Sequence, residues 1–149
     1  KNASGSSNPL TVLVSTNLSI QANFAERLTT NYPTPLWWLA ANGYSNFQSA
    51  VTTTGANGIP VWQSYQAGLN PADAKSQLKL SMARSETANV LTWSPVANRL
   101  YTILSSTNAA IGFAPVAGAI NLPATTPGFT DASNPSNKLK FYKLSVRLP

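Results

Sequence analysis

Val90–Ser105 reads VLTWSPVANRLYTILS, and this stretch decides the fold class. It holds two short runs rich in apolar, aromatic and β-branched residues, Val90–Ser94 and Leu100–Ser105, on either side of a connection that contains Pro and Asn. Runs of this length and composition, bounded by such residues, are typical of β-strands. We expect Trp93 and Tyr101 to be aromatic residues of the core.

The same pattern continues from Gln77 to the end of the sequence. Turn residues separate the apolar runs at short intervals, which favours antiparallel strands. Further strands are predicted at Leu78–Arg84, Gly112–Ala117, Gly128–Asp131 and Leu139–Leu148. Residues 77–149 are therefore expected to form an antiparallel β-sandwich of roughly six to eight strands.

Residues 27–76 have a different character and are predicted to be an insert of short helices and loops. The expected helices are Leu36–Asn42, Asn46–Val51 and Pro60–Ala67. Gly43 and Gly68 follow two of them and are typical helix-ending residues, while Pro60 suits the first turn of a helix.

The sequence before this insert divides into a small polar leader, residues 1–8, and a predicted β-hairpin, residues 9–26, which reads PLTVLVSTNLSIQANFAE. Apolar residues alternate along both arms of the hairpin. The side chains that would need cover are Leu10, Val12, Leu13, Val14, Leu18, Ile20 and Phe24. An isolated hairpin is marginally stable in water. The apolar side chains of the hairpin would be buried either against the sandwich of the same chain or against a second copy. In the second case the hairpin would add a strand to an open sheet edge of that copy.

The fold class is therefore predicted to be mainly β: an N-terminal β-hairpin, a short helical insert and an antiparallel β-sandwich. The chain has 149 residues, of which 43% are hydrophobic and only 9% are charged, against roughly 25% charged residues in ordinary domains. A weakly charged surface opposes the close packing of copies very little. We expect a homo-oligomer or polymer.

The net charge of +6 comes from 10 basic and 4 acidic residues. Proteins that bind nucleic acid usually carry dense clusters of Lys and Arg, and here most are scattered, so no nucleic-acid partner is expected. The exception is Lys138, Lys140, Lys143 and Arg147. They are interpreted either as lysines that guard an edge strand or as a patch for an anionic polysaccharide.

Catalytic and metal-binding groups are scarce. The sequence lacks His and Cys, and its only carboxylates are Glu26, Asp73, Glu86 and Asp131. Each is predicted at a turn or a strand end, with Asp73 and Asp131 as turn residues. We therefore expect no enzyme, no metal and no cofactor. No apolar run approaches the roughly 18 residues that would span a bilayer.

Thr53–Asn70 reads TTGANGIPVWQSYQAGLN. This segment resembles the calcium loop, of EF-hand or dockerin type, in C-terminal modules of secreted proteins from Planctomycetes and Verrucomicrobia, whose pattern is DxDGDGxPxWQEYxAGTDPT. The matching residues are Gly58, Pro60, Trp62, Gln63, Tyr65, Ala67, Gly68, Asn70 and Pro71, with Trp37, Trp38 and Leu39 in the helix that precedes the loop. The resemblance implies that a small β-sandwich follows, and that the chain is extracellular or at the cell surface.

The loop departs from the calcium pattern at its ligands. Positions 1, 3, 5 and 12, which should supply oxygens, are Thr53, Gly55, Asn57 and Ser64, and Gly58 fills position 6. Because every carboxylate is missing, we interpret the loop as a turn that works without metal. The alternative is a weak calcium site made by Thr53, Asn57 and the carbonyl of Ile59.

The segment NPLTVLVSTNLSIQANFA resembles the closing strands of bacterial extracellular β-repeats that end in "sITAtFa". The upstream strands of such a repeat do not occur in this sequence. We therefore predict a non-catalytic extracellular structural module that self-associates into a fibre or surface layer through its N-terminal strands. The alternative is a carbohydrate-binding or anchoring module of a larger secreted protein, with Trp37 and Trp38 as sugar-stacking rings; core packing is the other explanation of this pair.

Overall fold

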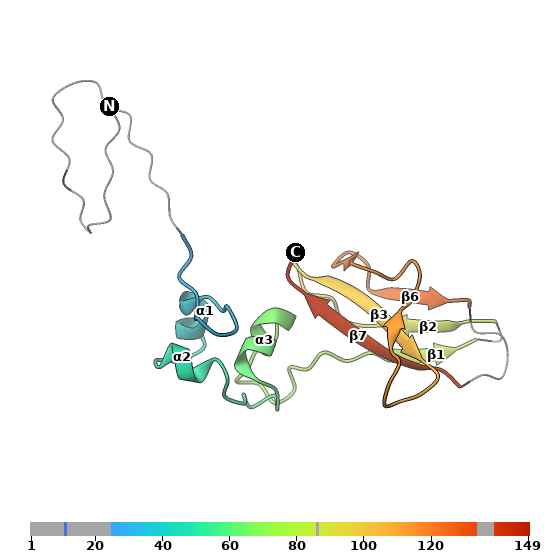
Figure 1. Ribbon diagram of the computed structural model, residues 1–149, viewed down its shortest axis with the longest axis horizontal. Coiled ribbons are helices and arrows are strands. Elements are labelled where there is room, and N and C mark those ends of the chain that lie inside the picture. The colour runs from blue at the N-terminus through green and yellow to red at the C-terminus, as the bar shows by residue number, and fades with distance from the viewer. Residues whose placement is uncertain (1–10, 12–24, 86, 134–138) are drawn as a thin grey trace, which may run out of the picture.

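The computed structural model describes residue 11 and residues 25–85, 87–133 and 139–149. Of the predicted hairpin, residues 9–26, only Thr11, Ala25 and Glu26 are described. All seven side chains named for self-association lie outside the described residues, as does Lys138. The fold is mainly β, with three short helices placed before two antiparallel sheets (Figure 1).

The helical insert has its own small core. Its helices are α1 (Leu36–Ala41), α2 (Phe47–Ala50) and α3 (Val61–Ala67), each within about two residues of the prediction. Leu39, Val51 and Val61 are fully buried. Gly68 ends α3 with a φ of 70°, a left-handed conformation that glycine adopts without strain.

The strands follow the predicted pattern in two sheets. They are β1 (Ser81–Arg84), β2 (Asn89–Thr92), β3 (Leu100–Ser106), β4 (Ala114–Pro115), β5 (Leu122–Pro123), β6 (Gly128–Asp131) and β7 (Phe141–Arg147). The first sheet has the order β1-β2-β6, and in the second β3 pairs with β4, β5 and β7.

Two differences from the prediction concern the shortest strands. The predicted strand Gly112–Ala117 is reduced to β4, which pairs with β3 at two positions only. β5 lies outside all the predicted strands, and it also contributes two pairs. Both strands contain a proline, which has no N–H to extend a ladder, so the pairing stays short.

The two sheets share one apolar core, which makes the predicted sandwich. Leu91 of the first sheet clusters with Tyr101 and Ile103 of the second, and all three side chains are fully buried. Trp93 is 6% exposed, with its ring 5.7 Å from the ring of Tyr101. The prediction that Trp93 and Tyr101 are core aromatics is therefore confirmed.

The insert is joined to the sandwich at α3, which lies against β7 (Figure 1). Arg99, in the connection between β2 and β3, donates a hydrogen bond from Nη2 to the backbone oxygen of Tyr65 at 2.5 Å. The longest helix of the described residues has seven residues, and none there is long and apolar enough to cross a membrane.

Candidate functional site

The outer edge of β7 is the longest strand edge that the described residues leave open. β7 pairs with β3 from Phe141 to Arg147, over all seven of its residues. β3 has β4 and β5 on its other side, so β7 has a neighbour on one side only within the described residues. Such an edge presents a row of backbone N–H and C=O groups to which another strand can pair.

Two basic side chains of β7 lean away from this edge. The ammonium nitrogen of Lys143 lies 3.9 Å from the ring centroid of Phe113, the residue before β4. Arg147 donates a hydrogen bond from Nε to Oδ1 of Asn121, the residue before β5, at 3.1 Å. Since β4 and β5 lie beyond β3, both side chains reach across the sheet. Among the described residues β7 is an edge strand, which agrees with one of the two interpretations of its lysines, but these two cations point away from its open edge.

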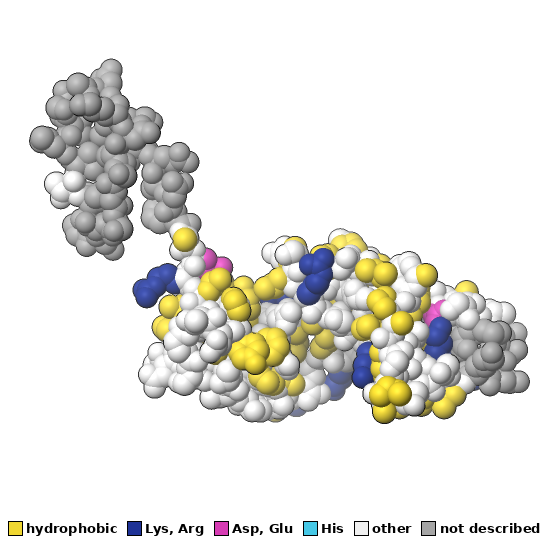
Figure 2. All heavy atoms as spheres, in the orientation of Figure 1, with side chains coloured by type: hydrophobic (Ala, Val, Ile, Leu, Met, Phe, Trp, Pro, Cys, Tyr) yellow, Lys and Arg dark blue, Asp and Glu magenta, His cyan; other side chains and the backbone are white. Residues whose placement is uncertain are grey.

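The basic residues predicted as one patch are divided in the structure. Lys143 and Arg147 belong to the exposed face of β7, whereas the side chain of Lys140 is only 18% exposed and is paired with Asp131. On the face shown in Figure 2, Lys and Arg are scattered among uncharged polar surface. Of the described members, Lys143 and Arg147 share the exposed face of β7.

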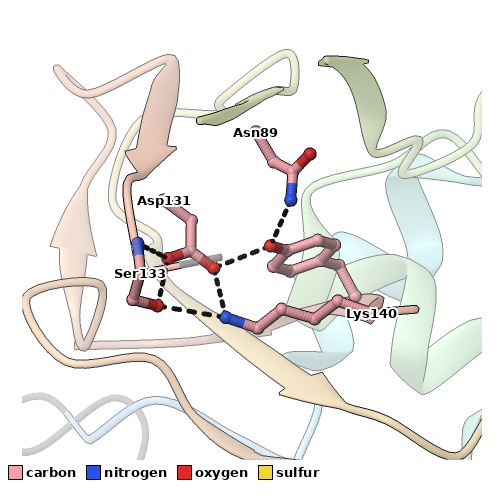
Figure 3. Close-up of polar contacts among 5 residues, drawn as sticks. Asn89, Asp131, Ser133 and Lys140 are labelled. Carbon is pink, nitrogen blue, oxygen red and sulfur yellow. Dashed lines mark hydrogen bonds and ion pairs between the residues drawn. The ribbon is translucent and has the colours of Figure 1, made fainter. Parts of the chain in front are cut away.

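Asp131, at the end of β6, is the centre of a polar cluster that connects three strands (Figure 3). Its carboxylate is 2% exposed. Oδ1 accepts hydrogen bonds from the backbone N–H of Ser133 at 2.9 Å and from its hydroxyl at 2.5 Å. Oδ2 accepts from the ammonium of Lys140 at 2.5 Å and from the hydroxyl of Tyr142 at 2.7 Å. Asn89 of β2 donates to the same hydroxyl at 2.9 Å.

This cluster therefore fastens the two sheets to each other, because Asn89 and Asp131 belong to one sheet and Tyr142 to the other. The prediction that Asp131 is a turn residue is confirmed by its bond to the Ser133 N–H. The ion pair with Lys140 was not predicted. A signal was present, because Lys140 and Tyr142 are two residues apart on a predicted strand and so share a face.

The electrostatics of the cluster move the pKa values of Asp131 and Tyr142 away from neutral pH. Burial raises the pKa of the Asp131 carboxyl, but the hydrogen bonds from Lys140, Ser133 and Tyr142 outweigh it and hold that pKa well below its usual range. Burial, together with the hydrogen bond to the Asp131 carboxylate, raises the pKa of Tyr142 to about 12. A general acid or base works best with a pKa near the operating pH, so this arrangement suits a structural clamp better than proton transfer.

The other described carboxylates are single and apart. Glu26 Oε1 accepts a hydrogen bond from the indole N–H of Trp37 at 2.6 Å. Asp73 Oδ1 accepts from the backbone N–H of Lys75 at 2.8 Å, which confirms its prediction as a turn residue. Within residues 25–85, 87–133 and 139–149, no three acidic, His or Cys side chains come together as a metal site would require.

The loop that resembles a calcium site is closed by an amide. Gly58 has a φ of 82°, as the turn at position 6 requires. Asn57, at position 5, is 4% exposed and donates a hydrogen bond from Nδ2 to the hydroxyl oxygen of Ser64, at position 12, at 2.9 Å. Two positions that would hold a cation in a calcium loop thus bind each other directly.

The other two oxygens of the alternative calcium site also form hydrogen bonds with neighbouring backbone groups. The hydroxyl of Thr53 donates to the backbone oxygen of Ala50 at 2.7 Å. The carbonyl of Ile59 accepts from the backbone N–H of Gly55 at 2.9 Å. The loop holds its shape by internal hydrogen bonds.

The adjacent tryptophans of α1 do not form a shared surface. Trp37 is 61% exposed, so the core interpretation is wrong for this residue. Trp38 is half-buried and meets the ring of Tyr65 edge-on, with a centroid distance of 5.2 Å. The two side chains diverge because neighbouring residues on a helix point about 100° apart. α1 buries only Leu39 fully, which leaves Trp37 on the outside.

Comparison with models of protein families, with curated proteins and with solved structures finds no match for this chain.

Proposed function

We propose that this chain is a non-catalytic extracellular structural module that self-associates into a fibre or surface layer. In this proposal the N-terminal strands of one copy add to the open edge of β7 in the next copy. The observation that carries the proposal is that edge: seven residues long, paired on one side among the described residues, and not covered by Lys143 or Arg147.

The N-terminal sequence suits that edge in length, charge and pattern. Leu18–Phe24 has seven residues, the length of β7, and the whole stretch from Leu10 to Phe24 has no charged side chain. The inner face of β7 is made of half-buried Tyr142, Leu144 and Val146. A strand with alternating apolar residues, added to this edge, would place its own apolar side chains beside the inner face of β7 and would increase the burial of that face.

The geometry of such a contact favours a polymer. A donated N-terminal strand and a receiving β7 edge are different surfaces, so the contact is head-to-tail. Head-to-tail contacts that do not close into a ring propagate as a filament. The low charge of the chain, 9% of residues, opposes this packing very little.

Proline substitution in the donated strand tests the proposal. Ile20→Pro removes a backbone N–H from the middle of that strand, so we expect loss of assembly in electron micrographs and by light scattering. Ser15→Pro is the matched control, because Ser15 lies in the predicted turn between the two strands. The Ile20→Pro chain still presents an intact β7 edge and should therefore shorten wild-type fibres when the two are mixed. Assembly by Ile20→Pro to the same extent as by wild type would reject strand addition.

A second candidate function is attachment to a polysaccharide. The observation that favours it is the exposed indole of Trp37, 61% accessible and held in place by its hydrogen bond to Glu26. Aromatic rings offer a flat apolar surface on which a sugar ring can stack. An acidic polysaccharide would instead meet Lys143 and Arg147. Trp37→Ala, compared with wild type in a sedimentation assay on insoluble polysaccharide, tests this candidate; unchanged sedimentation excludes Trp37 from it.

A further inference from the structure

A pocket of about 380 Å³ lies between α3 and the sandwich. One wall carries Gln63 and Gln66 of α3, and the opposite wall carries Gln77, Leu78 and Val146 of the sandwich and the segment leading into it. The two walls belong to parts of the chain that are fastened together by the hydrogen bond from Arg99 to the backbone of Tyr65. Small-molecule sites are commonly found at such junctions, in pockets of roughly this size.

The chemistry of this pocket is neutral. No charged side chain of the described residues lines it; its polar groups are amides and the rest of its lining is apolar. Burying an ionic ligand there would leave the charge without a partner, which is costly. The lining therefore favours an uncharged ligand that has both hydrogen-bonding groups and apolar faces.

Two of the amides form no hydrogen bond with another described residue and can therefore bind such a ligand. Among the hydrogen bonds of the described residues, none involves the side chains of Gln63 or Gln66, which are half-buried. Asn57, by contrast, uses its amide within the loop. A glutamine amide supplies two N–H donors and one acceptor oxygen, and a sugar hydroxyl can both accept and donate.

A second, aromatic pocket of about 200 Å³ shares one lining residue, Gln66, with the first. Its wall includes the rings of Tyr32 and Trp62, which stack with a centroid distance of 4.6 Å. Leu148, just beyond β7, also lines it. In the part of the chain that the structure describes, this pocket too is lined without a charged side chain.

We infer that the two pockets together form a binding site for a neutral oligosaccharide of two or more rings, with Gln66 at the junction. The amide pocket would bind hydroxyl or acetamido groups of one ring, and the aromatic pocket would take the apolar face of the next. This inference rests on the second candidate function, attachment to a polysaccharide. It places the sugar in the pockets beside α3 and not on the exposed ring of Trp37. It is independent of the β7 edge.

Nuclear magnetic resonance titration of the full chain tests the assignment, with cellotriose, chitotriose and maltotriose as probes. At least one of them at millimolar concentration should shift the side-chain amide signals of Gln63 and Gln66. Gln66→Ala should weaken that binding by roughly three- to tenfold, the effect of one or two lost hydrogen bonds. Gln48→Ala is the matched control, because the Gln48 side chain accepts from the backbone of Thr30 and lines neither pocket.

Trp37→Ala separates the two sugar-binding surfaces. Binding that survives Trp37→Ala and weakens with Gln66→Ala supports the α3 site. Binding lost with Trp37→Ala and kept with Gln66→Ala overturns the α3 site and leaves polysaccharide attachment standing. No shift with any of the three probes at millimolar concentration overturns the α3 site and also a neutral-sugar site at Trp37. Tighter binding of an oligogalacturonate than of the neutral probes overturns the neutral assignment.

Discussion

Removing the buried carboxylate of Asp131 should destabilise the sandwich strongly. Asp131→Ala leaves the ammonium of Lys140 without its partner, and the hydroxyl of Tyr142 and both donors of Ser133 without an acceptor. Breaking one side of a buried ion pair generally costs about 3–5 kcal/mol. Lys140 is 18% exposed and can regain some hydration, so we expect the lower end, about 3 kcal/mol of unfolding free energy.

A second substitution distinguishes an ion pair from simple packing. Lys140→Met removes the ammonium but keeps much of the apolar stem of the side chain. The double variant Asp131→Ala/Lys140→Met buries no unpaired charge, so its loss of stability should be smaller than the sum of the two single losses by about 1–3 kcal/mol. Urea unfolding of the four proteins, followed by tryptophan fluorescence, measures each free energy.

The same pair predicts a dependence on pH. Because the folded-state pKa of Asp131 is below its unfolded value, the unfolded chain binds the proton more readily in acid. The stabilisation is therefore complete near neutral pH and is lost as pH falls below about 4. Asp131→Ala should lack this loss. A destabilisation under about 1 kcal/mol by Asp131→Ala, or an acid sensitivity equal to that of wild type, would refute the reasoning.

Three further predictions concern other parts of the chain. The pKa of Tyr142 is raised to about 12 in the folded chain, so the folded chain keeps the phenolic proton to a higher pH than the unfolded chain does. The free energy of unfolding should therefore fall as pH rises from about 10 towards 12. Tyr142→Phe should show a smaller fall in urea titrations at alkaline pH. Asn57→Ala should lower the free energy of unfolding by about 1–3 kcal/mol, because the loop loses its closing amide. EDTA should leave the melting temperature of the wild-type chain unchanged. A drop of several degrees on adding EDTA would mean that a cation holds this loop. Gly68→Ala should cost more than Gly43→Ala, since both have a positive φ but only at Gly68 does an added Cβ meet a side chain, Val96 Cγ1 at 2.5 Å; equal melting temperatures for the two variants would contradict this.

The main elements of the fold could be predicted because their signals are local. The runs Val90–Ser94 and Leu100–Ser105 became β2 and β3 within about two residues. Gly68 ends α3 because few other residues adopt its left-handed conformation easily. β4 and β5 were harder to predict, because two residues of pairing depend on where β3 lies and leave almost no pattern in the sequence.

The candidate sites depended on contacts between distant residues. The lysines of β7 could be interpreted as guarding an edge strand, but only the pairing partners of β3 identified which side of β7 the described residues leave open. Similarly, the order of residues gave no reason to place Gln66 and Val146 around one pocket. The sequence can state which side chains are available, but not which of them meet.

The sequence by itself determined the β-rich class, the ends of the helices and a loop without carboxylates, because strand propensity, left-handed glycines and ligand chemistry act within a few residues of the chain. The tertiary structure alone decided that Asp131 is buried against Lys140, that Trp37 is exposed and that, among the described residues, β7 is paired on one side only. Burial and strand pairing depend on the neighbours that folding brings together, and those neighbours lie far away in the sequence.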